Sequence, residues 1–374
     1  KPNKGGTCKM KKRKVLAVLL CAAMTAALAV GCGGSKGSDS SDKSSDSSSS
    51  SDDVITVGFS QVGAESDWRT ANSQSMKDTF SKENGYDLIF DDAQQKQENQ
   101  ITAIRNFIQQ EVDYILLAPV TETGWDTVLQ EAKDADIPVI IVDRMVDVSD
   151  DSLYTTWIGT DALCEGRKAA EWLNGFAEAK GIAASDIHIA DIQGTIGSTA
   201  QIGRTKGLEE GVEKYGWDLV AQQTGEFTQA KGQEVMESML KQYDNINVVY
   251  CENDNEAFGA IDAIEAAGKT VGSDIANGEI MVISFDTTHA GLQDVLDGKI
   301  ECDVECNPLH GPRAEELIKK LEAGEDVEKL NYVDEEIFAK DDTVKSVKAT
   351  NSLDEEKDFD VTPLTQDILD GRAY

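Results

Sequence analysis

Short runs of apolar, β-branched residues alternate with longer amphipathic segments along the chain from Val54 onward. The most uniform run extends from Val139 to Val142 and follows Pro138. Four consecutive apolar residues are typical of a strand buried on both faces, as in a parallel sheet. Strands that alternate with helices favour parallel sheets with right-handed crossovers. The pattern therefore predicts an α/β protein built on doubly wound sheets.

The alternation runs through the chain twice. In the first pass we expect strands at 54–59, 87–90, 114–117, 139–142 and 154–158, with helices at 68–82 and 125–133 and helical spacing of apolar residues over 101–108. In the second we expect strands at 187–192, 217–221, 246–250 and 280–285, with helices at 162–179, 199–215, 231–242 and 256–267. Two similar passes favour two lobes over one sheet. A strand at 299–304, a helix at 312–321 and a strand-like segment at 332–338 are expected to complete the lobes and cross between them.

Composition narrows the class of protein. The chain has 374 residues, of which 40% are hydrophobic and 28% charged, so it can bury a large core, and its length favours two domains. The formal net charge is −34, although the first 31 residues hold seven Lys or Arg and no Asp or Glu. The rest is therefore strongly acidic, which argues against nucleic acid or anionic lipid as a partner of the folded part.

The N-terminal segment predicts export. Basic residues at 11–14 precede an apolar run and then small residues, an order typical of a secretory signal peptide, and the run is too closely bounded for a secure membrane span. The residues just before Cys32 resemble the bacterial lipobox. We therefore expect residues 1–31 to be leader and signal peptide and Cys32 to be lipidated. An uncleaved signal anchor is the alternative.

Residues 32–53 begin with the predicted lipidation site, Cys32, and are rich in Ser and Asp. From residue 35 they offer no apolar side chain to bury, so we expect a disordered tether that reaches roughly 20 to 25 Å. A lipid anchor, a tether and an acidic body together indicate a capture protein on the extracytoplasmic face of the cell membrane.

Candidate binding side chains follow the strands of the first pass. Asp143 and Arg144 come directly after the most apolar strand, and ligands of open α/β sheets bind beyond the carboxyl ends of the strands. A carboxylate beside a guanidinium can hold a polyhydroxylated ligand from two sides, although a solvated surface ion pair is the alternative. Trp68 and Arg69 could stack on a sugar face and hydrogen-bond its hydroxyls, unless Trp68 packs in the core.

The second pass offers further charged, polar or aromatic candidates, and some of them follow an expected strand directly. They are Arg204, Phe227, Asn253 and Asp286.

The seven cysteines and three histidines show no spacing typical of a zinc site. Cys302 and Cys306, four residues apart in a strand, would lie about 13 Å apart, too far for a disulfide. We interpret both as buried free thiols and leave the pairing of Cys164 and Cys251 open. We expect no metal and no cofactor.

A series of motifs, in order along the chain, resembles the substrate-binding proteins of pentose and hexose ABC importers, most of all the galactofuranose-binding members. The similarity covers residues 54 to about 374. The motifs are Val57-Gly58-Phe59-Ser60-Gln61-Val62, Trp68-Arg69, Gln94 to Gln100, Ala118-Pro119-Val120, Glu131-Ala132-Lys133-Asp134, Asp143-Arg144, Lys231 to Ser238 and Asn253-Asp254.

This resemblance implies a type I periplasmic-binding-protein fold, in which two lobes are joined by a three-segment hinge and a sugar binds in the cleft between them. By position, residues 54–160 plus 306–335 would form the first lobe, and 161–305 plus 336–374 the second.

The resemblance also implies the ligand contacts. The first lobe would supply Glu65, Trp68, Arg69, Asp143 and Arg144. The second would supply Arg204, Phe227, Asn253 and Asp286, and Glu305 would lie at a hinge crossing. The expected partners are a monosaccharide and the permease subunits of an ABC importer, with the protein itself a monomer.

Three other classes of protein share part of this pattern. A glycosidase also needs carboxylates in a cleft, but the chain has no nucleophile elbow, no HExxH and no phosphate-loop motif, so we expect no enzyme. Repressors with this fold need an N-terminal helix-turn-helix, where this chain has an export signal. A sugar sensor that presents its ligand to a membrane kinase stays open as the alternative to transport.

Overall fold

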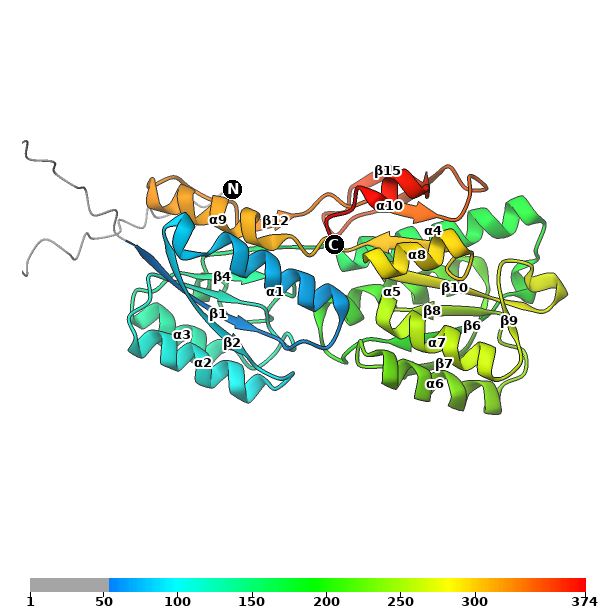
Figure 1. Ribbon diagram of the computed structural model, residues 1–374, viewed down its shortest axis with the longest axis horizontal. Coiled ribbons are helices and arrows are strands. Elements are labelled where there is room, and N and C mark those ends of the chain that lie inside the picture. Colours follow the sequence, from blue (N-terminus) through cyan, green and yellow to red (C-terminus); the bar gives the residue numbers. More distant parts are fainter. Residues whose placement is uncertain (1–53) are drawn as a thin grey trace, which may run out of the picture. The chain divides into compact units, whose positions relative to one another are not determined.

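The computed structural model describes residues 54–374, which form two large β-sheets, each with helices on both faces, and one two-stranded sheet (Figure 1). The predicted α/β fold with parallel-sheet lobes is confirmed. The predicted signal peptide, the lipidation of Cys32 and the tether lie outside the described residues.

The first sheet has six parallel strands in the order β12-β5-β4-β3-β1-β2. Its central strands are buried along their whole length, as the apolar run at 139–142 predicts. The strands are β1 (Ile55–Gln61), β2 (Tyr86–Asp92), β3 (Tyr114–Leu117), β4 (Val139–Val142), β5 (Thr156–Gly159) and β12 (Leu330–Tyr332).

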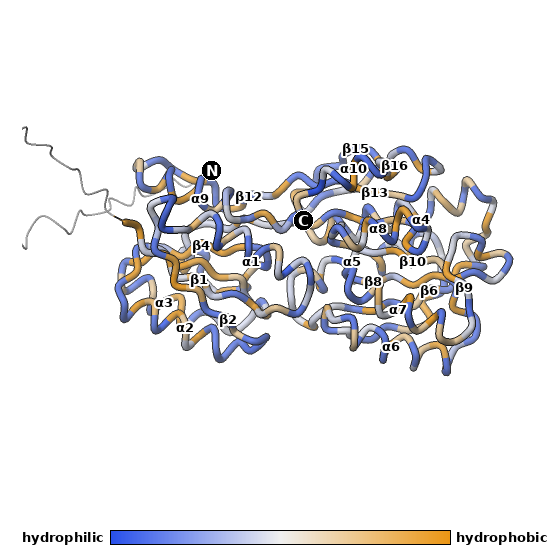
Figure 2. The backbone as a smooth tube through the Cα atoms, viewed as in Figure 1, coloured by the Kyte–Doolittle hydropathy of each residue, from blue (hydrophilic) through white to orange (hydrophobic). Residues whose placement is uncertain are grey.

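Four helices cover this sheet. Met76 of α1 and Leu317 of α9 pack on one face, while Ile104 of α2 and Leu129 of α3 pack on the other. Figure 2 shows the apolar residues of the chain gathered along the strands and polar ones outside. The helices are α1 (Asp67–Thr79), α2 (Gln97–Gln109), α3 (Asp126–Asp134) and α9 (His310–Glu322).

The second sheet has the order β16-β13-β11-β10-β8-β6-β7, with β9 paired to β10. All its pairings are parallel except that of β11 with β13. The strands are β6 (His188–Gln193), β7 (Asp218–Thr224), β8 (Val248–Cys251), β9 (Thr270–Val271), β10 (Glu279–Asp286), β11 (Cys302–Glu305), β13 (Ile337–Ala339) and β16 (Thr362–Pro363).

Helices cover both faces of this sheet as well. Leu173 of α4 and Leu208 of α5 belong to the core on one face, and Met236 of α6, Ile261 of α7 and Leu292 of α8 to the core on the other. The helices are α4 (Ala162–Lys180), α5 (Thr199–Tyr215), α6 (Gln229–Gln242), α7 (Asp254–Ala266), α8 (His289–Asp297) and α10 (Gln366–Asp370).

The chain passes between the two sheets three times, at 160–161, 306–309 and 333–336. The prediction of one strand-like segment over 332–338 is wrong, because β12 ends at Tyr332 in the first sheet and β13 begins at Ile337 in the second. The residues between them form the third crossing. The hairpin of β14 (Ser346–Thr350) and β15 (Glu356–Asp360), together with α8, α10 and β16, was not predicted.

Two further findings concern the described residues. Cys164, Cys251, Cys302 and Cys306 are all buried free thiols, which confirms the interpretation of Cys302 and Cys306 and answers the open question for the other two. Among residues 54–374, no helix is both long enough and apolar enough to cross a membrane.

Candidate functional site

A cavity of about 30 Å³ lies where the carboxyl ends of strands from the two sheets face each other. Nine of the ten residues predicted to bind ligand line it, and Glu305 does not. The lining residues are Glu65, Ser66, Trp68, Arg69, Asp143, Arg144, Ala200, Arg204, Phe227, Asn253, Asp286 and Cys306. A single water molecule needs a cavity of roughly 10 to 15 Å³. A monosaccharide is several times larger than a water molecule, so it can enter this cavity only if the surrounding groups move.

Chain geometry explains why these side chains converge. Glu65 and Arg69 flank the start of α1, where Ser66 is the N-cap and accepts a hydrogen bond from the Arg69 N–H at 3.1 Å. Asp143 directly follows β4, and Asn253 directly follows β8. Asp286 ends β10. All are at the carboxyl ends of parallel strands, where open α/β sheets bind ligands.

In the first lobe the charged groups form one buried network. Arg69 Nη1 lies 2.8 Å from Asp143 Oδ2, and Arg69 Nε donates to Glu65 Oε1 at 3.0 Å. Arg144 Nη2 is 3.7 Å from the same Glu65 oxygen, and Arg144 Nη1 donates to the carbonyl of Val120. Glu65 Oε2 is buried and has no hydrogen-bond partner among the described residues. It is therefore free to accept a hydrogen bond from a ligand hydroxyl.

Burial and charge act in opposite directions on this network. Burial raises the pKa of the Asp143 carboxyl, but the charges of Arg69 and Arg144 outweigh it, so the pKa is lowered overall. Burial and the charge of Arg69 lower the pKa of Arg144 to about 10. At neutral pH, Asp143 is therefore an anion that accepts charge-assisted hydrogen bonds.

Trp68 is held by three neighbours, one of which, the Arg69 guanidinium, lies over its ring. Its indole N–H donates to the carbonyl of Cys306 at 2.6 Å, and the ring of His310 meets it edge-on at a centroid distance of 5.9 Å. The guanidinium of Arg69 lies 4.6 Å from the Trp68 ring centroid. Trp68 is thus both buried, as a core residue would be, and part of the cavity wall, as a ligand contact would be.

In the second lobe Arg204 is the central charge. Its Nε donates to Glu165 Oε2 at 2.8 Å, and its Nη2 lies 3.5 Å from Asp286 Oδ1. Burial raises the pKa of Asp286 well above its ordinary value, although the charge of Arg204 opposes this. Glu165 is the nearer of the two carboxylates to Arg204, and burial raises its pKa as well.

Phe227 forms the apolar part of the second lobe's wall. Its backbone carbonyl accepts a hydrogen bond from Asn253 Nδ2 at 3.2 Å, and its N–H donates to Glu256. A Cβ on Gly194 would lie 1.9 Å from the Phe227 ring, so this position admits only glycine without displacing the ring. The guanidinium of Arg144 lies 5.3 Å from the ring centroid, across the cavity.

Three lining residues adopt backbone conformations that favour glycine. Asp143 has φ 65°, Phe227 φ 60° and Asp286 φ 106°. Such conformations cost on the order of 1 kcal/mol each and persist where the surroundings impose them, commonly at binding sites. The strain coincides with the predicted ligand contacts in both lobes.

The lining is suited to a neutral polar ligand. Three arginines and three acidic residues face the cavity, so a ligand needs no net charge to complete it. Burial raises the pKa of the Cys306 thiol well above its ordinary value, which leaves it protonated and a poor nucleophile. The arrangement can bind hydroxyl groups and stack on an apolar ring face.

Glu305 is the last residue of β11, directly before the second crossing, and does not line the cavity. It accepts hydrogen bonds from Arg372 Nη2 at 2.9 Å, from the Tyr374 hydroxyl at 2.6 Å and from the backbone N–H of Glu336. Its carboxylate is thus occupied by the C-terminal segment and the third crossing. Glu305 therefore connects β11 to the C-terminal segment and to the third crossing, and it is not one of the residues that line the cavity.

Sequence reasoning missed Ala200 and Cys306 as lining residues and Glu165 as the partner of Arg204. Cys306 was interpreted only as a buried thiol, and the acidic residue at position 165 carries no signal beyond its place in a helix. Glu165, Cys306 and Glu335 place ligand-type atoms within 4.8 Å of one another. Arg204 already pairs with Glu165, and Lys168 lies close to Glu335, so we assign no metal to this group.

Comparison with known proteins identifies close relatives. Residues 57–310 match the family model described as periplasmic binding protein domain. The galactofuranose-binding protein YtfQ of Escherichia coli (strain K12) is 39% identical over 304 residues, which cover 80% of this chain and 92% of YtfQ.

Solved structures give the same picture. A Mycobacterium smegmatis protein in complex with β-D-fucofuranose is 46% identical with a TM-score of 0.72, over 77% of this chain and 92% of that one. The binding component of the arabinose ABC transporter from Shewanella sp. ANA-3, bound to α- and β-L-arabinofuranose, is 44% identical with a TM-score of 0.71, over 77% and 93% of the two chains.

Proposed function

Because the chain belongs to the periplasmic binding protein family, we propose that it captures a monosaccharide in the cavity between its lobes and delivers it to the permease of an ABC importer. The observation that carries this proposal is the cavity wall itself. Three arginines, three acidic residues, Trp68 and Phe227 converge there from both lobes.

The proposed ligand is a sugar in its five-membered ring form. The relatives described above carry galactofuranose in their name or furanoses in their structures. Charged side chains suit neutral hydroxyls because a hydrogen bond to an ionised group is stronger than one between neutral groups. Glu65, Trp68, Arg69, Asp143 and Arg144 are the proposed contacts from the first lobe, and Arg204, Phe227, Asn253 and Asp286 those from the second.

The proposed mechanism is closure of the lobes on the sugar. A ligand that contacts both lobes binds the closed form more tightly and shifts the population toward it. The small cavity supports this mechanism, since the sugar must enter while the lobes are further apart. The proposed lobes are residues 54–160 plus 306–335 and 161–305 plus 336–374, and the membership of β12 and β13 in different sheets supports the last boundary.

The cellular setting is part of the proposal. The protein is proposed to be a monomer, exported and anchored to the extracytoplasmic face of the membrane through lipidated Cys32. The basic, apolar and small-residue segments before Cys32 support this anchoring.

Two isomers with locked rings test the ligand. 1,4-Anhydrogalactitol keeps a five-membered ring and 1,5-anhydrogalactitol a six-membered one, and neither can interconvert as free sugars do. Calorimetric titration and a thermal shift are expected to detect the first and not the second, because a ligand at a hundred times its dissociation constant adds about 2.7 kcal/mol of stability. Binding of only the six-membered ring contradicts the ring form, and binding of neither isomer nor of any pentose or hexose contradicts the function.

A further inference from the structure

The hydroxyl of Thr199 joins the two lobes without touching the ligand cavity. Thr199 begins α5 in the second lobe. Its Oγ1 donates to Glu122 Oε1 at 2.7 Å and accepts from the backbone N–H of Met145 at 2.7 Å. Both partners belong to loops of the first lobe, one after β3 and the other after β4. The Thr199 hydroxyl therefore makes two hydrogen bonds to the other lobe, one as a donor and one as an acceptor.

The backbone reinforces this junction. The N–H of Glu122 donates to the carbonyl of Gly197 at 2.9 Å, and the carbonyl of Glu122 accepts from the N–H of Asp147 at 2.7 Å. Gly197 has φ 85°, a conformation that disfavours any side chain at this contact. Glu122 is thus tied to the second lobe by its backbone and its side chain, and to the neighbouring loop of its own lobe.

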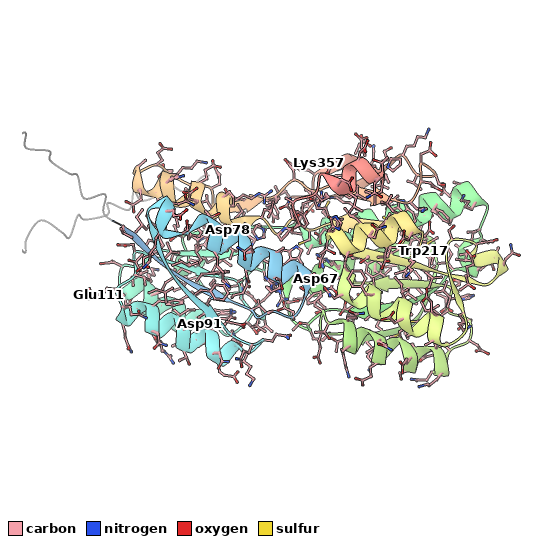
Figure 3. All side chains as sticks on the ribbon, viewed as in Figure 1. Asp67, Asp78, Asp91, Glu111, Trp217 and Lys357 are labelled. Carbon is pink, nitrogen blue, oxygen red and sulfur yellow. The ribbon has the colours of Figure 1, made fainter. Side chains whose placement is uncertain are left out.

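A second contact between the lobes joins the start of α1 to α7. The N–H of Asp67, labelled at the start of α1 in Figure 3, donates to Asn255 Oδ1 in α7 at 3.0 Å. Asn255 is 8% exposed, so water competes little for this bond. Ser66 and Ala200, the neighbours of Asp67 and Thr199, line the cavity, whereas Asp67, Glu122, Met145, Thr199 and Asn255 do not. Each junction is therefore adjacent in sequence to a residue that lines the cavity.

We propose that the Thr199 junction, defined as Glu122, Met145, Gly197 and Thr199, sets how long a bound sugar is retained. This inference rests on the proposed function and adds a residue that acts on affinity through lobe closure rather than through ligand contact. The hydrogen bonds form only when the lobes are together, so their free energy favours the closed form whether or not a sugar is present. The apparent dissociation constant then depends on the closed fraction of the free protein.

The junction should affect release of the sugar more than its entry. The sugar leaves only after the junction breaks, whereas entry occurs while it is broken. Weakening the junction should therefore raise the dissociation rate constant and change the association rate constant little. Because no junction residue faces the cavity, the ratio of affinities for two sugars should stay constant.

Thr199→Val removes the hydroxyl and keeps the branched shape. We expect the dissociation rate constant, measured by stopped-flow tryptophan fluorescence, to rise about tenfold, as loss of paired hydrogen bonds implies. Thr199→Ser, which keeps the hydroxyl, should restore most of the retention. Thr102→Val is the matched control, since the Thr102 hydroxyl only bonds the Glu98 carbonyl within α2. Circular dichroism shows that each variant is folded.

Small-angle X-ray scattering of the sugar-free protein provides a second readout. We expect a larger radius of gyration for Thr199→Val than for the parent and for Thr102→Val. An unchanged dissociation rate and radius overturn the inference, and so does a changed ratio of affinities between sugars, which would make Thr199 a ligand contact. If the parent protein binds no sugar at all, the proposed function fails, and the scattering comparison alone decides the junction.

Discussion

Arg69 Nη1 lies 2.8 Å from Asp143 Oδ2, and both side chains are buried in the wall of the cavity. The pair links the first turn of α1 to the end of β4 and leaves the anion of Asp143 facing the ligand space. The carboxyl of Asp286 occupies the opposing wall but has a raised pKa, whereas that of Asp143 has a lowered one. Burial and neighbouring charge therefore shift the pKa values of the two carboxyls in opposite directions.

Asp143→Asn should weaken sugar binding much more than Asp286→Asn at neutral pH. The first change removes a charge that strengthens hydrogen bonds and leaves Arg69 less well paired, which costs about 2 kcal/mol or roughly thirtyfold in affinity. The second removes a carboxyl whose pKa burial raises, so its charge is less favoured, and replaces it by a neutral amide of similar shape. Calorimetry measures both, with Asp78→Asn on the exposed side of α1 as control. Equal losses would show that the two carboxyls act in the same charge state.

Acid should destabilise the fold through His310. Asn72 Nδ2 donates to the carbonyl of Pro308 and faces His310 Nδ1 at 3.0 Å, so Nδ1 must accept, and a protonated ring would lose this bond. Burial lowers the pKa of His310 to about 4, from 6.5. The lowered value contributes stability above pH 6.5 that is lost as the pH falls to about 4, about 3 kcal/mol in all.

Thermal unfolding between pH 7 and pH 4 measures this loss. In His310→Leu the melting temperature should fall less steeply over that range. An equally steep fall in the variant would assign the acid sensitivity to other groups.

Gly194→Ala should reduce sugar affinity without unfolding the second lobe. The new Cβ would lie 1.9 Å from the ring of Phe227, so the ring must leave its place in the wall. We expect at least a tenfold loss in calorimetry, since a buried aromatic contact contributes more than 1 kcal/mol. Gly175→Ala is the matched control, because its Cβ meets Val344 at an ordinary 3.4 Å. Unchanged affinity in Gly194→Ala would remove Phe227 from the proposed contacts.

Glu305→Gln should lower stability more than affinity. The carboxylate of Glu305 receives the hydrogen bonds of Arg372 and Tyr374, and these bonds outweigh burial to lower its pKa. Loss of its charge should cost about 1 to 2 kcal/mol in the free energy of unfolding, measured in urea. A large loss of affinity with unchanged stability would instead make Glu305 a direct ligand contact.

Much of the site could be predicted because it depends on strand ends. The apolar run at 139–142 locates the end of β4, and with it Asp143, without knowledge of the partner lobe. Glu165 and Cys306 could not be found this way. Glu165 meets Arg204 because α4 packs against α5, and Cys306 meets Trp68 because the second crossing packs against α1. Residues 332–338 show the same limit, since periodicity does not tell which sheet a strand joins.

The C-terminal hairpin shows a further limit. Only Val347 and Ala349 of β14 are buried, and Lys348 lies between them, so the alternation is too short to separate a strand from a loop. Helix α8 has nine residues and was missed for a similar reason, because its three buried positions barely define a period.

A crystal structure of the protein grown with the sugar that binds it in calorimetry tests the central claim most directly. We predict one monosaccharide in the cavity, with hydroxyl oxygens within about 3.2 Å of Asp143 from the first lobe and of Asn253 or Asp286 from the second. A sugar that contacts only one lobe, or that binds outside this cavity, would contradict the account.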